Sequence, residues 1–222
     1  MQRFKNCHKG KRGFIVCNGP GLNDIDVTKL EGELVFGLNR GYLKKGLPIN
    51  YLVVANDLVE KQFGDEMKKY ARKNCSAFFT CYLTGPRCFP LQFTPDIPKF
   101  TGDPTKPMWQ GYTVTYSAIQ LAYYMGITTL YLIGLDHHFS YDTAKKVSGR
   151  GLLSTGPDPN HFSSNYWGKG VRWDKYGVKA ATKAYRLARR AFDKAGRKIY
   201  NASSVTHLSE DIFPRVDFEE LF

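Results

Sequence analysis

The residues best suited to chemistry in this 222-residue sequence follow short apolar runs. The run Phe14–Cys17 has the character of a β-strand and ends in the turn Asn18-Gly19-Pro20-Gly21. A glycine turn after a strand lets backbone N–H groups approach a phosphate. Gly-Pro-Gly also closes ordinary turns, and no third glycine stands at the spacing of the dinucleotide fingerprint, so the turn alone is a weak signal.

Two more apolar runs end in small polar clusters. Leu34–Leu38 is followed by Asn39-Arg40, and Tyr51–Ala55 is followed by Asn56-Asp57. Continuous apolar strands are typical of a parallel sheet that is buried on both faces. Ligands bind such sheets at the carboxyl ends of the strands, so we expect the three polar clusters to face one crevice.

A fourth run, Thr129–Ile133, leads through Gly134-Leu135 to an acid and two histidines. Asp136 is a candidate catalytic residue, although a carboxylate there also caps turns. Adjacent strand residues point to opposite faces, so one histidine is expected in the crevice, with His138 as the candidate, and a shared metal is disfavoured. His161 is a candidate general base, since an imidazole pKa of about 6.5 lies near neutral pH.

A hydroxyl-rich stretch, Gly111–Ser117, precedes the apolar helix expected over Ala118–Met125. Helix N-termini with hydroxyl side chains attract anions, because their backbone N–H groups are unpaired. Thr113 and Thr115 are therefore candidate nucleotide-binding residues.

The remaining pattern predicts an α/β fold. A charged amphipathic helix is expected over 58–73, a strand over 76–80, a basic amphipathic helix over 177–195 and a last strand over 198–201. The stretches 85–112 and 139–175 are expected to be irregular and lid-like, as long loops in compact domains commonly are. We predict one Rossmann-like domain over 1–222, with a mostly parallel sheet, helices on both faces and a long irregular lid.

Charge and cysteine content limit the function classes. Lys and Arg number 32 against 20 Asp and Glu, a net charge of +12 that favours an anionic partner. No motif with base-reading geometry is present, so no specific nucleic acid is expected. Five scattered cysteines make no disulfide framework, and no apolar run reaches the roughly 18 residues of a membrane span. A cytoplasmic protein is expected, with peripheral contact at the inner face of an anionic membrane as a further option.

Four segments together resemble known families: 17–26, 38–40, 131–136 and 198–202. Over nearly the whole chain they resemble the MptE-like family, which is related to 6-hydroxymethylpterin diphosphokinase. Separate segments are also similar to the bacterial CMP-sialic acid sialyltransferases, which share the Asn-Gly-Pro turn.

The sialyltransferase resemblance implies one nucleotide-binding α/β domain with a lid, no required metal, and inversion at the anomeric carbon. The family's catalytic histidine falls on Lys169, so the resemblance leaves the base open between His161 and His138. It places Thr113-Val114-Thr115 at the family's Thr-Ser-Gly, and it implies that two lid tyrosines hold the phosphate. The expected nucleotide-binding residues are Asn18, Gly19, Pro20, Gly21, Asn39, Arg40, Thr113, Thr115, Tyr141, Tyr166 and Lys169.

Three functions follow from these patterns. The first is a glycosyltransferase of surface glycan biosynthesis that moves a sugar from a nucleotide donor to a glycan acceptor, with a CMP-linked acidic sugar as the expected donor. The second is a pyrophosphokinase that acts on 6-hydroxymethylpterin with ATP and Mg²⁺, for which carboxylates are available at Asp24, Asp26, Asp57, Asp136 and Asp142. The third is a nucleotide- or polyanion-binding module without catalysis.

Overall fold

A parallel sheet forms the centre of the protein in a computed structural model that describes residues 1–95 and 98–222. Its seven strands within these ranges are β1 (Arg12–Val16), β2 (Val35–Leu38), β3 (Tyr51–Val53), β4 (Ala77–Thr80), β5 (Cys88–Pro90), β8 (Thr129–Ile133) and β12 (Lys198–Asn201). Their spatial order is β12-β8-β1-β2-β3-β4-β5, and every neighbouring pair is parallel. The chain therefore leaves β1 toward β2 on one side and returns to β8 on the other.

The apolar runs become strands because both of their faces are buried. Phe14 and Val16 of β1 pack into one hydrophobic cluster, whereas Ile15 between them packs into the cluster on the opposite face. The same alternation separates Val35 from Phe36 on β2. A strand covered on both sides needs no polar face, and this confirms the predicted parallel sheet.

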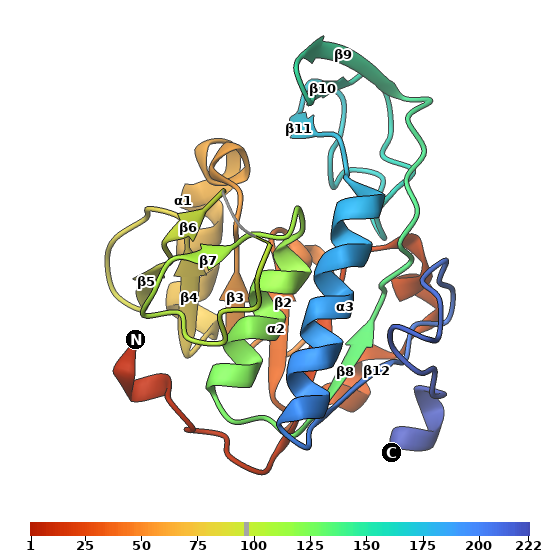
Figure 1. Ribbon diagram of the computed structural model, residues 1–222. Helices are drawn as coiled ribbons and strands as arrows, with labels where there is room; N and C mark the ends of the chain where they lie inside the picture. Colours follow the sequence, from red (N-terminus) through yellow and green to blue (C-terminus); the bar gives the residue numbers. More distant parts are fainter. Residues whose placement is uncertain (96–97) are drawn as a thin grey trace.

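Helices cover both faces, as predicted (Figure 1). On one face lie α2 (Val114–Tyr124) and α3 (Val178–Lys194), and α3 buries Ala181, Ala184 and Ala188 there. On the other face lie α1 (Asp57–Asn74) and the 3-10 helices η2 (Pro20–Asp24) and η3 (Val27–Leu30). Further 3-10 turns are η1 (Gln2–Phe4), η4 (Gly41–Leu43) and η5 (Glu219–Leu221).

The two stretches predicted to be irregular contain strands, which corrects that prediction. The first holds β5 and the pair β6 (Phe93–Thr94) and β7 (Met108–Trp109); residues 96–97 within it lie outside the described residues. The second holds an antiparallel sheet of β9 (Ala144–Ser148), β10 (Gly151–Ser154) and β11 (Arg172–Asp174), which projects beyond the end of α3 in Figure 1. These strands are short, and β9 is mostly exposed, so no hydrophobic alternation marks them in the sequence.

Across residues 1–95 and 98–222, no helix is both long enough and apolar enough to cross a bilayer.

Candidate active site

A cavity of about 490 Å³ opens at the carboxyl ends of β1, β2, β3 and β8. The strand order reverses between β1 and β8, which is where open α/β sheets form their ligand crevice. The asparagines of the three predicted clusters, Asn18, Asn39 and Asn56, all line this cavity. Arg40 and Asp57, their partners in sequence, are not among its lining residues.

Three buried oxygens on the cavity wall receive no hydrogen bond from the described residues: Asn18 Oδ1, Asn39 Oδ1 and Asp136 Oδ1. Asn18 is held in place because its Nδ2 donates to the carbonyl of Leu38 at 3.0 Å. Asn39 has a left-handed backbone with φ of +46°, which asparagine tolerates better than most residues. A buried acceptor without a donor costs about 1–3 kcal/mol, so these oxygens are suited to a ligand that brings donors.

The glycine turn after β1 has a different role from the one expected. The Gly19 N–H donates to the Gly134 carbonyl at 3.0 Å, and the Gly21 N–H donates to Asp136 Oδ2 at 2.8 Å. These two N–H groups are therefore occupied by the protein and are not open to a phosphate. A Cβ on Gly19 would overlap the carboxyl group of Asp136, so the glycine is required by this close approach.

Asp136 lines the cavity. Burial raises its pKa above the ordinary value, although the hydrogen bond from Gly21 acts in the opposite direction. One carboxylate oxygen is thus anchored by the turn, and the other is left for a ligand.

The N-terminus of α2 supplies the strongest anion-attracting feature of the cavity. Thr113 is the N-cap, and its Oγ1 accepts from the Thr115 N–H at 3.3 Å. Thr113 Oγ1 also lies 3.4 Å from the Tyr185 hydroxyl. Thr113, Val114 and Thr115 all line the cavity, so the positive end of the helix dipole faces it. The helix begins four residues earlier than predicted, which brings these hydroxyls into its first turn.

His161, which lines the cavity, is paired with a buried acid. Its Nδ1 lies 2.7 Å from Asp158 Oδ2, and Asp158 also accepts from the backbone N–H groups of Asn160 and Trp167, each at 2.8 Å. The imidazole stacks on Tyr166, with ring centroids 4.0 Å apart and an interplanar angle of 4°. Burial raises the pKa of Asp158, but these hydrogen bonds outweigh it and hold the pKa below its ordinary value.

The contact between Nδ1 and Asp158 fixes the orientation of the His161 ring. Nε2 is the ring nitrogen that this contact does not use. Asp158 was missed in the sequence because an isolated acid in an irregular stretch carries no pattern. The spacing Asp-x-x-His was the one available signal.

Both histidines after β8 line the cavity, whereas strand alternation predicted one. The strand ends at Ile133, and His137 has a left-handed φ of +56°, so the alternation does not extend to these residues. The His137 ring lies between the Tyr176 hydroxyl, 3.0 Å from Nδ1, and the Thr182 hydroxyl, 2.9 Å from Nε2. His138 is exposed.

Six of the expected residues do not line the cavity: Pro20, Gly21, Arg40, Tyr141, Tyr166 and Lys169. Tyr166 is fully buried, and its hydroxyl accepts from the Arg40 N–H at 3.1 Å. Its role is to pack against the His161 ring. Tyr141 stacks on Trp173, and Lys169 is exposed on the lid. The hydroxyls of the two tyrosines are bonded to backbone groups, which explains why neither reaches the cavity.

The lid contributes side chains that the sequence did not identify. Arg150, Asn160, Lys175 and Tyr176 line the cavity from the region of β9–β11. They lie in stretches without periodicity, so only the folding of the lid over the sheet brings them to the site. Among residues 1–95 and 98–222, no group of three or more His, Cys, Asp or Glu side chains is placed to hold a metal ion.

Comparisons with known proteins support the fold. No protein-family model and no curated protein matches the chain, so the expected MptE-like resemblance rests on the quoted segments alone. Among solved structures the chain is similar to the sialyltransferase CstII from Campylobacter jejuni, determined in complex with a substrate analogue, cytidine-5'-monophosphate. The TM-score is 0.50 at 14% identity, over 92% of this chain and 85% of that chain. The predicted Rossmann-like α/β class is confirmed, with a distant resemblance in fold to a sialyltransferase.

Proposed function

We propose that this protein is a glycosyltransferase that uses a CMP-linked acidic sugar as donor and a glycan hydroxyl as acceptor. The main support for this proposal is that three oxygens without a hydrogen-bond donor, on Asn18, Asn39 and Asp136, line the same cavity as the N-terminus of α2. The similarity in fold to a sialyltransferase solved with CMP adds to it.

The cavity offers complementary groups for each part of a nucleotide. The cytosine amino group and the ribose hydroxyls are donors, which the unpartnered oxygens of Asn18, Asn39 and Asp136 would accept. The phosphate is an anion, which the first turn of α2 would stabilise through the positive end of the helix dipole.

His161 is the proposed general base. Its Nε2 would take the proton of the acceptor hydroxyl as that oxygen attacks the anomeric carbon and the bond from this carbon to the phosphate oxygen breaks. CMP leaves with the bonding electrons, and the α2 N-terminus stabilises its charge. Asp158, bonded to Nδ1, would stabilise the positive charge that forms on the ring.

The alternative with ATP and Mg²⁺ is less well supported, because three of the five candidate carboxylates have other partners. Asp57 pairs with Lys61 at 2.9 Å, and Asp142 accepts from the Ser140 hydroxyl at 2.7 Å. Asp26 caps η3. Of the five acids considered for a metal, Asp136 alone belongs to the cavity lining.

A thermal-shift panel of CMP, CDP, UDP, GDP, ATP and a pterin, each with and without Mg²⁺, tests the proposal. A ligand that binds the folded state raises the melting temperature by mass action. A metal-independent rise with CMP is the expected result. A rise with ATP and Mg²⁺ alone would favour the pyrophosphokinase, and binding of CMP without any sugar transfer would favour a binding module.

Replacing Asn39 tests the nucleotide contact directly. Asn39→Gly removes the side-chain oxygen and still accepts the left-handed backbone, whereas Asn39→Ala adds strain there. We expect Asn39→Gly to weaken CMP binding about tenfold, the value of one hydrogen bond. Calorimetric titration measures the affinity, and an unaltered affinity in a folded variant would remove Asn39 from the site.

A further inference from the structure

Three residues meet at the rim of the cavity: Tyr112, Arg150 and Lys175 (the rim cluster). Lys175 contacts Arg150 through its backbone, and its ammonium group lies 5.0 Å from the centroid of the Tyr141 ring. The Lys175 N–H donates to the Arg150 carbonyl at 2.7 Å, and Arg150 Nη2 donates to the Lys175 carbonyl at 2.7 Å. The Arg150 guanidinium lies over the Tyr112 ring, 4.5 Å from its centroid. All three residues are exposed and line the cavity. The hydrogen bond to the Lys175 carbonyl and the contact with the Tyr112 ring position the Arg150 guanidinium before any ligand arrives.

The two positive charges of the rim cluster are not neutralised. Within the described part of the chain, no carboxylate lies at ion-pair distance from Arg150 or Lys175. Asp174 is the neighbour of Lys175 in sequence, but its Oδ2 accepts from Asn56 Nδ2 at 3.0 Å. The partners of the two cations are thus neutral, namely a carbonyl and aromatic rings. The N–H groups of Arg150 that the Lys175 carbonyl does not use, and the Lys175 ammonium group, can meet an external anion.

Tyr112 has a strained backbone. Its φ is +63°, a conformation that costs a bulky residue about 1–3 kcal/mol and is concentrated at functional sites. Tyr112 as a residue is 47% exposed. The strain places an aromatic face at the entrance, under the Arg150 guanidinium.

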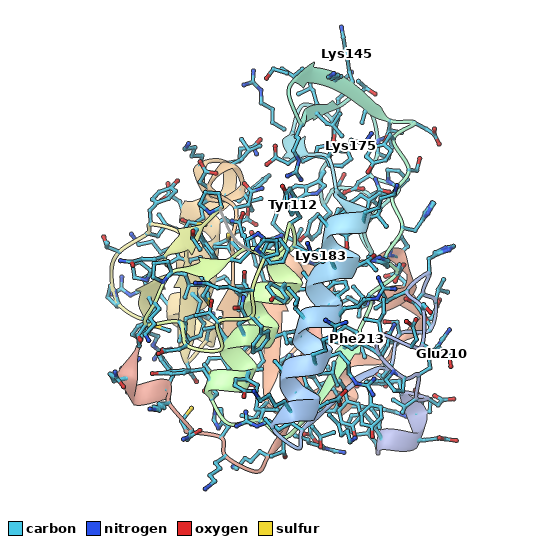
Figure 2. All side chains as sticks on the ribbon, viewed as in Figure 1. Tyr112, Lys145, Lys175, Lys183, Glu210 and Phe213 are labelled. Carbon is cyan, nitrogen blue, oxygen red and sulfur yellow. The ribbon has the colours of Figure 1, made fainter. Side chains whose placement is uncertain are left out.

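More lysines continue the positive charge outward from the rim. Figure 2 shows Lys145 on β9, Lys175 before the start of α3 and Lys183 on α3 in a row down the view, with Tyr112 beside this row. Lys146 and Lys179 are also exposed on β9 and α3. Such a field concentrates anions at a cavity entrance and raises their association rate.

We propose that the rim cluster binds an anionic group, a carboxylate or a phosphate, on the acceptor glycan. This inference rests on the proposed function, because the donor nucleotide is assigned to the floor of the cavity at Asn18, Asn39 and the α2 N-terminus. The rim is then the side from which an acceptor enters. Arg150 would hold the anion through the N–H donors that the Lys175 carbonyl does not use, Lys175 would add a point charge, and the sugar would lie near the Tyr112 ring.

The test is a titration of galactose, galacturonate and galactose 6-phosphate, each with and without saturating CMP. These probes are closely related sugars that are neutral, carboxylated or phosphorylated, so they separate the two sources of negative charge. We expect at least one anionic probe to bind about tenfold more tightly than galactose, as a charge-assisted hydrogen bond allows. Arg150→Met should remove this preference and leave the affinity for CMP unchanged.

Arg172→Met is the matched control, because Arg172 is an exposed arginine of the same lid sheet outside the cavity lining. Lys175→Met is a second variant, and a melting curve for each confirms folding. Equal binding of the three probes, no binding of any, or an equal loss in Arg172→Met would overturn the rim site. Weaker CMP binding in Arg150→Met would also overturn the rim site, because Arg150 and Lys175 would then bind the phosphate of the nucleotide.

The two proposals fail separately. If the wild-type protein does not bind CMP but binds the anionic probes through Arg150, the donor proposal fails and the rim site stands. If CMP binds and the probes show no charge preference, the rim site fails alone.

Discussion

His137 shows how burial at one residue sets the pH response of the site. Burial, assisted by the charge on His207, lowers its pKa from 6.5 to about 4, so the folded protein holds the neutral ring between two hydroxyls. As pH falls below 6.5, His137 binds a proton in the unfolded chain but stays neutral in the folded chain. Stability should therefore fall between pH 6.5 and about 4, by on the order of 3 kcal/mol.

Urea denaturation across this pH range measures the effect of His137. A His137→Gln variant should be less stable than the wild type at pH 7 but should lose less stability on acidification. The exposed His138→Gln is the control and should follow the wild-type curve. If His137→Gln and the wild type lose equal stability, the histidine is not the group that titrates.

A second prediction at the residue scale concerns the coupling between Asp158 and His161 in sugar transfer. Residues that act as one unit give non-additive losses, since removing either one removes the function of both. We expect Asp158→Asn to lower sugar transfer by on the order of 10²-fold, the usual contribution of a positioned base. The double variant Asp158→Asn/His161→Ala should be no slower than His161→Ala, and CMP affinity should stay constant. Additive losses in the transfer assay would show that the two act independently.

At the scale of elements, the turn between β1 and η2 fixes the geometry of the floor. Its glycine lets the Asp136 carboxyl group approach the backbone, and a Cβ at Gly19 would overlap that group. We expect Gly19→Ala to lower the free energy of unfolding by about 1–3 kcal/mol, as overpacking does, and to weaken CMP binding. Gly156→Ala is the control, since a Cβ there meets only ordinary contacts in the lid. Chemical denaturation compares the two variants, and equal stabilities would contradict the steric role.

At the scale of the whole molecule, the net charge of +12 should control the approach of ligands. Raising the ionic strength from ~0.01 M to ~0.15 M shortens the Debye length from about 30 Å to about 8 Å, which screens the row of lysines leading to the rim. The association rate of galactose 6-phosphate should then fall about tenfold, whereas galactose should associate at the same rate. Stopped-flow binding measures both rates, and equal salt dependence would exclude electrostatic steering.

The core elements were predictable because their signal is local. Phe14–Cys17 and Thr129–Ile133 are continuous apolar runs, and their parallel pairing follows from burial on both faces. The basic helix over 177–195 was found within one residue at each end, since its alanines recur at helical spacing. The placement of Asn18, Asn39 and Asp136 at one cavity followed from the rule that parallel strands end on the same edge.

The sequence by itself determined the sheet, its helices and the polar edge, because periodicity and burial act within a few neighbouring residues. The tertiary structure alone decided how those polar groups are used. It assigned the Gly21 N–H to Asp136, paired His161 with Asp158 and brought Arg150 and Lys175 to the rim. These contacts depend on the path of a lid with little hydrophobic pattern, and only its packing over the sheet fixes the partner of each side chain.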